Sequence, residues 1–243
     1  MGESFQFEVA TKGKTTALVY RAREPLAATL VLAHGAGTTQ THPFMVDMAA
    51  RLAARGLDVV TFNFLYTEQG RRMPDRTDTL EATWQAAIAS VRARGGLASE
   101  RLFCGGKSMG GRIVSNLAAA AVSADGDGDG DGLRLAGLVF LGYPLHPQDK
   151  PKVRRDEHLP RVPCPMLFVQ GSRDALGTAA EIRAVARHLP RASVHVVEGG
   201  DHSFDIPKRG ASITQGEVLD AVADAIIAFV RPPRSPRGTR KRP

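Results

Sequence analysis

Residues 102–119 read LFCGGKSMGGRIVSNLAA, and this stretch decides the fold. Residues 102–104 are typical of the end of a buried strand, and the small and apolar residues that follow the motif are typical of a helix. Between them lies a G-x-S-x-G motif that runs from Gly106 to Gly110. Glycine at both positions allows a turn so tight that a Cβ would collide with its neighbours. The stretch therefore predicts that Ser108 lies on a strained strand-to-helix turn, with its hydroxyl exposed above a sheet.

Two later stretches supply partners for this serine. PMLFVQGSRDALG, residues 165–177, predicts an apolar strand that runs into a loop containing Asp174. ASVHVVEGGDHSF, residues 192–204, predicts another strand, which ends shortly before His202. Serine, acid and histidine in this order, each at the carboxyl end of a strand, match an arrangement in which the acid orients the imidazole. We therefore expect Ser108 to be a nucleophile, His202 a general base and then acid, and Asp174 the orienting carboxylate.

A nucleophilic serine also needs two backbone N–H groups that face the developing oxyanion. The amide of Met109, directly after the serine, is the expected first donor. TLVLAHGAGTTQTH, residues 29–42, predicts an apolar strand and a glycine-containing loop, and the second donor is expected there, from Ala36 or Gly37. We expect His34, in the same loop, to hold the loop by hydrogen bonding rather than to act as a second base.

Strands and helices alternate along most of the chain. The first 25 residues show apolar and polar residues in alternation, which predicts an antiparallel hairpin at a sheet edge. Buried strands are expected at residues 30–34, 57–64 and 133–144, and helices at residues 43–55, 77–94 and 216–230. This order predicts an α/β fold, with a mostly parallel sheet covered by helices on both faces. The segment 145–164 is too short for a large cap domain.

Six motifs are spread over roughly residues 25–205: LAHGAG (32–37), NFLYTEQGRRMPDR (63–76), GGKSMGGR (105–112), FLGYPLHP (140–147), EHLPRVPCPMLFVQGSRDALG (157–177) and EGGDHSF (198–204). In these motifs the chain resembles small α/β-hydrolases of the dienelactone-hydrolase-like kind, and more narrowly a family of compact predicted hydrolases. The resemblance implies the α/β-hydrolase fold and the serine-hydrolase machinery, but little about the substrate. Dienelactone hydrolases themselves use a cysteine nucleophile, so Ser108 departs from their pattern. A related branch includes subunits of chromatin-modifying complexes, which keeps a non-catalytic interaction role as an alternative.

The expected reaction is the hydrolysis of a small carboxylic ester through an acyl-enzyme intermediate on Ser108, without a cofactor or a metal. A thioesterase or a peptidase would use the same residues. Arg71, Arg72 and His146 are expected near the mouth of the site, where they would favour substrates with a carboxylate or phosphate. The alternative for these three residues is a solvated, charged loop without a role in binding.

Most of the net charge of +7 lies in the last thirteen residues, 231–243, which hold six basic residues and no acid. Removing those six charges leaves +1 for the rest of the chain. We expect residues 1–230 to form a single domain and residues 231–243 to form a disordered basic tail, for which a nucleic-acid partner is not expected. ADGDGDGDG, residues 124–132, resembles the start of a calcium loop but lacks the glutamate at the twelfth position, so a flexible surface loop is expected.

No segment approaches the roughly 20 apolar residues of a membrane helix, so no membrane association is expected. Cys104 and Cys164 both lie at strand positions with apolar or proline neighbours. They are expected to be buried and reduced, as in a reducing compartment. Together with the absence of an apolar signal region at the amino terminus, this predicts a cytoplasmic protein.

Overall fold

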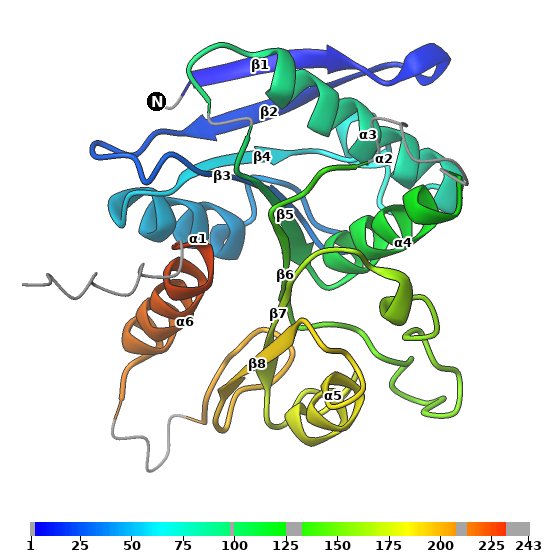
Figure 1. The fold of residues 1–243 in the computed structure, drawn as a ribbon, viewed down its shortest axis with the longest axis vertical. Helices are drawn as coiled ribbons and strands as arrows, with labels where there is room; N and C mark the ends of the chain where they lie inside the picture. The colour runs from blue at the N-terminus through cyan, green and yellow to red at the C-terminus, as the bar shows by residue number, and fades with distance from the viewer. Residues whose placement is uncertain (1–2, 98–99, 125–132, 208–212, 232–243) are drawn as a thin grey trace, which may run out of the picture.

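One mixed sheet organises the molecule in the computed structural model, which describes residues 3–97, 100–124, 133–207 and 213–231 (Figure 1). The described strands follow the spatial order β1-β2-β4-β3-β5-β6-β7-β8. Their bounds are β1 Glu3–Glu8, β2 Lys14–Tyr20, β3 Thr29–Ala33, β4 Asp58–Phe62, β5 Leu102–Lys107, β6 Gly137–Leu141, β7 Met166–Gly171 and β8 Ala192–Val197.

The first two strands form the antiparallel hairpin that the sequence predicts at the sheet edge. β1 pairs only with β2 among the described strands, and β2 pairs antiparallel with β4. The pairs from β4 through β3, β5, β6 and β7 to β8 are all parallel. β5 lies in the middle of the parallel part, so the turn that follows it opens at the centre of the carboxyl edge, where chain segments from several strands meet.

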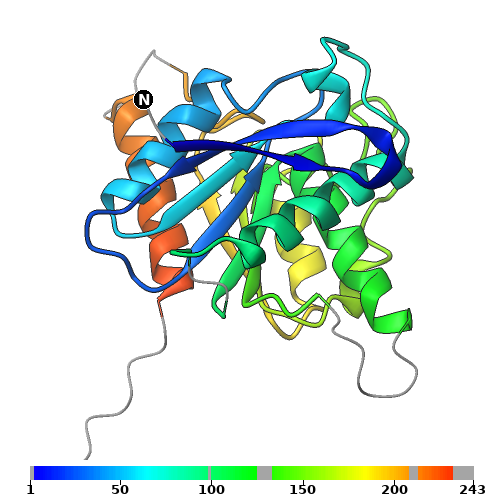
Figure 2. The same cartoon turned by 90° about the horizontal axis from the view of Figure 1, so that it is seen from above.

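Helices cover both faces of the sheet, as Figures 1 and 2 show. Their bounds are α1 Pro43–Ala54, α2 Leu65–Glu68, α3 Thr77–Ala93, α4 Met109–Ala124, α5 Ala179–Ala186 and α6 Gln215–Val230. The helices expected at residues 43–55, 77–94 and 216–230 are α1, α3 and α6, with ends shifted by one residue or less, and the helix expected after the G-x-S-x-G motif is α4. α6 begins at Gln215 because Thr214 forms a capping box with Glu217. Helices α3, α4 and α5 lie on one face, and α1 and α6 lie on the other.

Two apolar layers fill the space between the helices and the sheet. Trp84, Ile113 and Phe140 belong to the layer under α3 and α4, and Leu30 and Met48 belong to the layer under α1. All five of these side chains are fully buried, and each contributes about 1.5–3 kcal/mol of transfer free energy. Trp84 also donates from Nε1 to the carbonyl of Gly110 at 3.1 Å, so the core supports the turn after β5 directly.

The segment 145–164 contains one short 3₁₀ turn, η2 Leu159–Arg161, and no cap domain.

Both cysteines are free and buried, as the sequence predicts. Within the described residues, no helix is long and apolar enough to cross a membrane. The Asp-Gly segment and residues 232–243 of the tail lie outside the described residues.

Candidate active site

The turn between β5 and α4 holds Ser108 in a strained backbone conformation. Its φ is +50°, in the left-handed region, which costs a non-glycine residue roughly 1–2 kcal/mol. A Cβ on Gly106 would lie 2.7 Å from the carbonyl oxygen of Ala33, and one on Gly110 would lie 2.7 Å from the carbonyl oxygens of Ala33 and His34. Glycine at these two positions therefore lets β5 and α4 pack directly against the end of β3. The turn raises the serine side chain above the carboxyl edge of the sheet.

Asp174 and His202 meet at this edge from the loops after β7 and β8. The Nδ1 of His202 donates to Oδ2 of Asp174 at 2.7 Å, and Asp174 is fully buried. The amide of Leu176 donates to the other carboxylate oxygen at 2.8 Å. Because the acid accepts the Nδ1 proton, the imidazole carries its lone pair on Nε2. That atom is the one available for proton transfer.

Gln170, on β7, holds the acid in place and was missed by the sequence reasoning. Its Nε2 donates to Oδ2 of Asp174 at 2.8 Å and to the carbonyl of Gly177 at 2.7 Å. Its Oε1 accepts the amide of Tyr143 at 2.7 Å, and the residue is fully buried. A signal for it was available in the sequence, because Gln170 is a polar residue in an apolar strand and lies shortly before Asp174.

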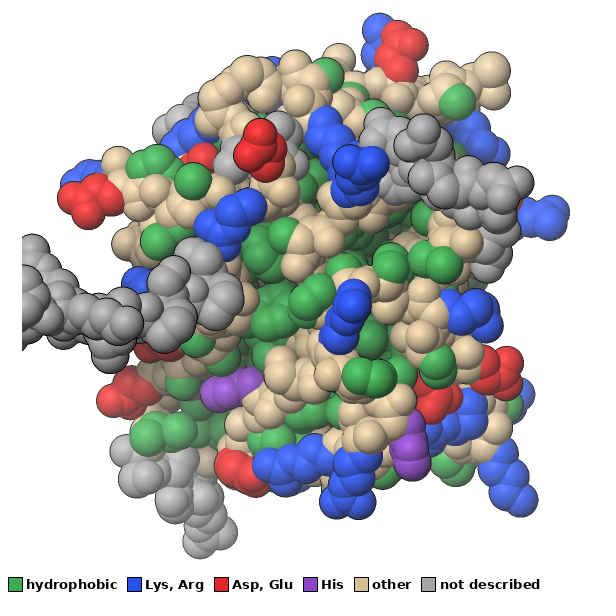
Figure 3. All heavy atoms as spheres, in the orientation of Figure 1, with side chains coloured by type: hydrophobic (Ala, Val, Ile, Leu, Met, Phe, Trp, Pro, Cys, Tyr) green, Lys and Arg blue, Asp and Glu red, His purple; other side chains and the backbone are tan. Residues whose placement is uncertain are grey.

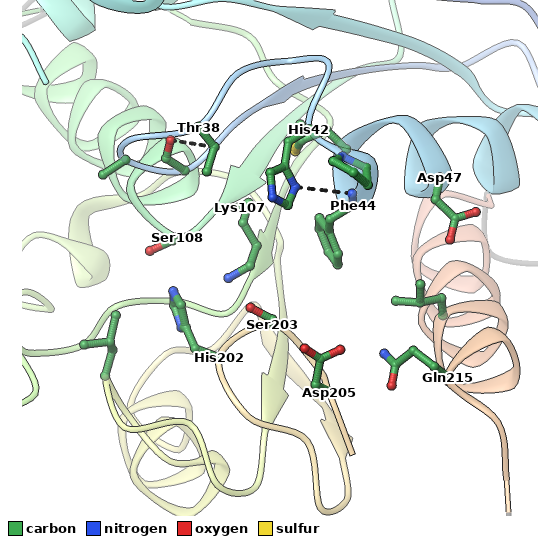
Figure 4. A pocket seen from close by; sticks show the side chains of 16 residues that line it. Thr38, His42, Phe44, Asp47, Lys107, Ser108, His202, Ser203, Asp205 and Gln215 are labelled. Atoms are coloured by element: carbon green, nitrogen blue, oxygen red, sulfur yellow. Dashed lines mark hydrogen bonds between the residues drawn. The ribbon is translucent and has the colours of Figure 1, made fainter. Parts of the chain in front are cut away.

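Ser108 and His202 line one cleft of about 790 Å³, and Figure 4 shows the His202 ring turned toward the serine. Among the described residues, no hydrogen bond joins the serine hydroxyl to the imidazole. Catalytic hydrogen bonds are often long before the substrate binds, so this arrangement is compatible with proton transfer after a small side-chain rotation.

A second cleft, of about 470 Å³, adjoins the other side of the serine, and Ala36, Met109 and Leu176 are among its walls. The two clefts meet at Ser108, since Ala36 and Leu176 also line both of them. In the orientation of Figure 1, Figure 3 shows hydrophobic side chains along the hollowed centre of the molecule, with Lys and Arg side chains around it.

The hydrogen bonds of the backbone amides distinguish between Ala36 and Gly37, the two candidates for the second oxyanion donor. Within the described part of the chain, the amides of Met109 and Ala36 donate to no other group, and both residues line the second cleft. The amide of Gly37 already donates to the hydroxyl of Tyr66 at 3.2 Å. The geometry therefore favours Ala36 over Gly37 as the partner of Met109.

His34 has the position expected of a structural residue. Its Nδ1 donates to the carbonyl of Gly35 at 2.8 Å, and its Nε2 accepts the amide of Phe64 at 3.1 Å. Burial, which disfavours the charged imidazole, lowers its pKa to about 4. A neutral ring with both nitrogens engaged fixes the loop that carries Ala36.

None of the three residues expected at the mouth of the site is among those that line the two clefts. Arg71 donates to Asp75 at 2.6 Å, Arg72 is exposed, and neither lines the two clefts described above. His146 is buried, and its Nε2 lies 3.3 Å from Glu181 at the start of α5. Asp75 itself lines the second cleft, so Arg71 lies beside that cleft, and a role of the three residues in binding the substrate stays a prediction.

No group of three or more metal-ligating side chains comes together within the described ranges.

The larger cleft contains a residue to which the sequence reasoning gave no role. Lys107, directly before the serine, extends into the larger cleft beside His202 (Figure 4).

Comparisons with known proteins agree with this architecture. A family model described as an alpha/beta hydrolase domain matches residues 26–231. A lidless alpha/beta serine hydrolase from Xanthomonas campestris superposes with a TM-score of 0.70 at 19% identity, covering 97% of both chains. A dienelactone hydrolase from Anabaena variabilis gives a TM-score of 0.69 at 17% identity, covering 94% of this chain and 96% of that one. An alpha-beta serine hydrolase homologue from Coxiella burnetii gives 0.69 at 17% identity, covering 93% and 96%.

Proposed function

We propose that this chain, which belongs to the alpha/beta hydrolase family, is a serine hydrolase that cleaves carboxylic esters through an acyl-enzyme on Ser108. The observation that carries the proposal is the pairing of His202 with the fully buried Asp174 at 2.7 Å, in the cleft that Ser108 lines. A serine on a strained turn, a histidine whose Nε2 makes no hydrogen bond within the described chain and a buried acid behind that histidine are the parts of an acyl-transfer site.

In the proposed reaction, Nε2 of His202 takes the proton of Ser108 as the hydroxyl oxygen attacks the ester carbonyl. The amides of Met109 and Ala36 stabilise the oxyanion that forms, and Asp174 stabilises the imidazolium. The imidazolium then protonates the departing alkoxide, which leaves an acyl group on Ser108. A water molecule, deprotonated by His202, hydrolyses the acyl-enzyme and restores the serine.

The missing cap supports small, accessible substrates. With only the η2 turn between residues 145 and 164, both clefts beside the serine stay open to solvent. Long acyl chains would gain little additional burial in such a site, so the proposal favours esters with short acyl groups.

The test is the hydrolysis of p-nitrophenyl esters, from acetate to decanoate, by the wild type and two serine variants. Ser108→Ala should lower kcat by about a thousandfold or more, because the nucleophile is lost. Ser203→Ala removes a serine that also lines the cleft and should retain activity within about threefold. Folding of each variant is checked by thermal unfolding.

Retained turnover in Ser108→Ala would refute the proposed mechanism. If the folded wild type hydrolyses no ester of the series, the ester proposal fails. The same residues are then tested on thioesters and peptides, and a lack of turnover there would favour a non-catalytic interaction protein.

A further inference from the structure

Lys107 places a buried ammonium in the larger cleft without a hydrogen-bond partner. Its Nζ is inaccessible to solvent, and no other described side-chain nitrogen or oxygen at such depth is left without a hydrogen bond. Buried polar groups are nearly always hydrogen-bonded, and leaving one unsatisfied is unfavourable, more so for a charged group. Such an unpaired group next to a reactive serine needs an explanation.

The carboxylates nearest to this ammonium are already engaged. Asp174 accepts hydrogen bonds from Gln170, Leu176 and His202. Asp201 accepts the amides of two loop residues with its Oδ1. Among the described residues, the amine has one aromatic contact, with Phe204, whose ring centroid lies 5.8 Å from Nζ, at the outer limit of a cation–π interaction. The part of the chain that the structure describes therefore supplies no direct counter-ion to the amine.

The amine faces the same space as the proposed reacting groups. A Cβ built on Gly142 would lie 3.0 Å from Nζ of Lys107 and 3.3 Å from Cε1 of His202, so these two atoms border one small gap. A Cβ built on Gly35 would lie 3.6 Å from both the Lys107 stem and the Cβ of Ser108. Figure 4 shows the Lys107 amine extending past Ser108 toward His202 and Ser203.

We propose that Lys107 binds a carboxylate of the substrate, so that the enzyme acts on esters that carry a free carboxylate within a short apolar distance of the scissile bond. The inference rests on the ester hydrolysis proposed above. The other walls of the cleft include the apolar side chains of Phe44, Met45, Leu176 and Leu219. An apolar chain that ends in an anion is complementary to such walls with one unpaired cation.

Lys107 is the one lysine or arginine among the described residues that line the larger cleft, which neither Arg71 nor Arg72 lines. A small rotation of the flexible lysine stem brings the amine to an anion that enters the cleft, and the ion pair then satisfies both groups. A carboxylate beside Lys107 would also hold the ester in one orientation against Ser108, which assists the reaction by positioning.

The charge of the amine gives the proposal a pH signature. Burial lowers the pKa of Lys107 to about 8, and the carboxylates of Asp174 and Asp201 oppose that shift. Four other charged or titratable groups of the described chain line the cleft. His42 caps the start of α1 and Asp47 lies within α1, while His202 and Asp205 follow β8. Lysine is cationic below its pKa, so the preference for an anion is present at pH 7 and is lost as the pH rises through about 8. Proton transfer by His202 is required for anionic and neutral esters alike, so its contribution cancels in their ratio.

The test compares matched anionic and neutral esters. Mono-p-nitrophenyl adipate is compared with its methyl ester, which places the anion in the acyl portion. The acetate ester of γ-hydroxybutyrate is compared with the same compound methylated at its carboxylate, which places the anion in the alcohol portion. In at least one pair, the wild type at pH 7 should favour the anionic ester by about tenfold to a hundredfold in kcat/KM, the value of one charge-assisted hydrogen bond.

Lys107→Met keeps the length of the side chain and removes the charge, and it should bring that ratio close to one. Lys150→Met removes an exposed lysine from the segment after β6, which lines neither cleft, and should leave the ratio unchanged. If Lys107→Met does not fold, the pH dependence of the wild-type ratio tests the same point. A wild-type ratio near one in both pairs, or a ratio that Lys107→Met leaves unchanged, overturns the inference. In either case, turnover of the neutral esters would show that the proposed hydrolysis itself stands.

Discussion

Gln170→Met tests whether the buried amide behind the acid is required for activity. Methionine has nearly the length and volume of glutamine, so the change removes hydrogen bonds without opening a cavity. Asp174 loses a donor at 2.8 Å, and the buried amide of Tyr143 loses its acceptor at 2.7 Å. A hydrogen bond to a charged group contributes about 1.5–3 kcal/mol, and an unsatisfied buried amide costs about 1–3 kcal/mol. The free energy of unfolding should therefore fall by about 4 kcal/mol.

That loss corresponds to a Tm lower by about 10 °C for a chain of this size, which leaves the protein folded at 25 °C if its stability lies in the ordinary range. Activity should also fall, because, within the described chain, the amide of Leu176 then makes the one hydrogen bond that holds the carboxylate apart from its bond to His202. A displacement of up to about 1 Å predicts a tenfold to hundredfold loss in kcat/KM. Thermal unfolding and p-nitrophenyl acetate hydrolysis measure the two effects on one sample.

Ser115→Ala is the control for this experiment. It removes buried hydrogen bonds to the carbonyl of Arg112 and to His158, both at 2.7 Å, in the layer under α4. It should cost about 1–2 kcal/mol of stability and leave kcat/KM within about twofold. A folded Gln170→Met protein with wild-type kcat/KM, or an equal loss of activity in Ser115→Ala, would refute the positioning role.

The other predictions concern the turn, the loop that faces it and acid stability. Gly110→Ala should destabilise the protein by about 3 kcal/mol in a urea titration and abolish ester hydrolysis, since its Cβ would lie 2.7 Å from two carbonyl oxygens. The control is Gly95→Ala, whose Cβ would meet no atom within 4 Å and which should be neutral or slightly stabilising in the same titration. Tyr66→Phe leaves the Gly37 amide without its acceptor and should lower kcat by about tenfold, and an unchanged kcat would show that this hydroxyl does not position the loop. Since the pKa of His34 falls from 6.5 to about 4 on folding, only the unfolded chain binds this proton between those values, and His34 alone should lower the free energy of unfolding by about 2 kcal/mol from pH 7 to pH 5, in addition to the loss from His158, whose pKa burial also lowers to about 4. Urea titrations at both pH values should show this loss in the wild type and a smaller one in His34→Gln; equal losses would contradict it.

The sequence predicts the parts of the fold that depend on local pattern. The hairpin, the parallel strands and helices α1, α3 and α6 each follow from apolar periodicity and from breakers at their ends. The turn at Ser108 could be predicted because both glycines and the strand before them are contiguous. The choice between Ala36 and Gly37 could not be made, since it depends on the hydroxyl of Tyr66, which reaches the loop from α2.

Residues that act through distant partners were beyond the sequence pattern. Gln170 stands out in the sequence only as a polar residue in an apolar strand, and its partners are known only once the sheet brings it beside the loop after β6. Lys107 stands inside the motif itself, but its lack of a partner is a property of the packed cleft. His146 was proposed for substrate binding from its charge and its place in the chain. The sequence does not show that the side chain is buried and contacts Glu181 of α5.

The most direct test of the account is covalent labelling by a fluorophosphonate, followed by mass spectrometry of the digested protein. The reagent reacts with serines that are activated by a neighbouring base and supported by oxyanion donors. We predict a single adduct on the peptide that contains Ser108, and a loss of that adduct in the folded His202→Ala variant. A folded wild-type protein that gains no adduct, or gains one at a different serine, would contradict the assignment of Ser108 as the nucleophile.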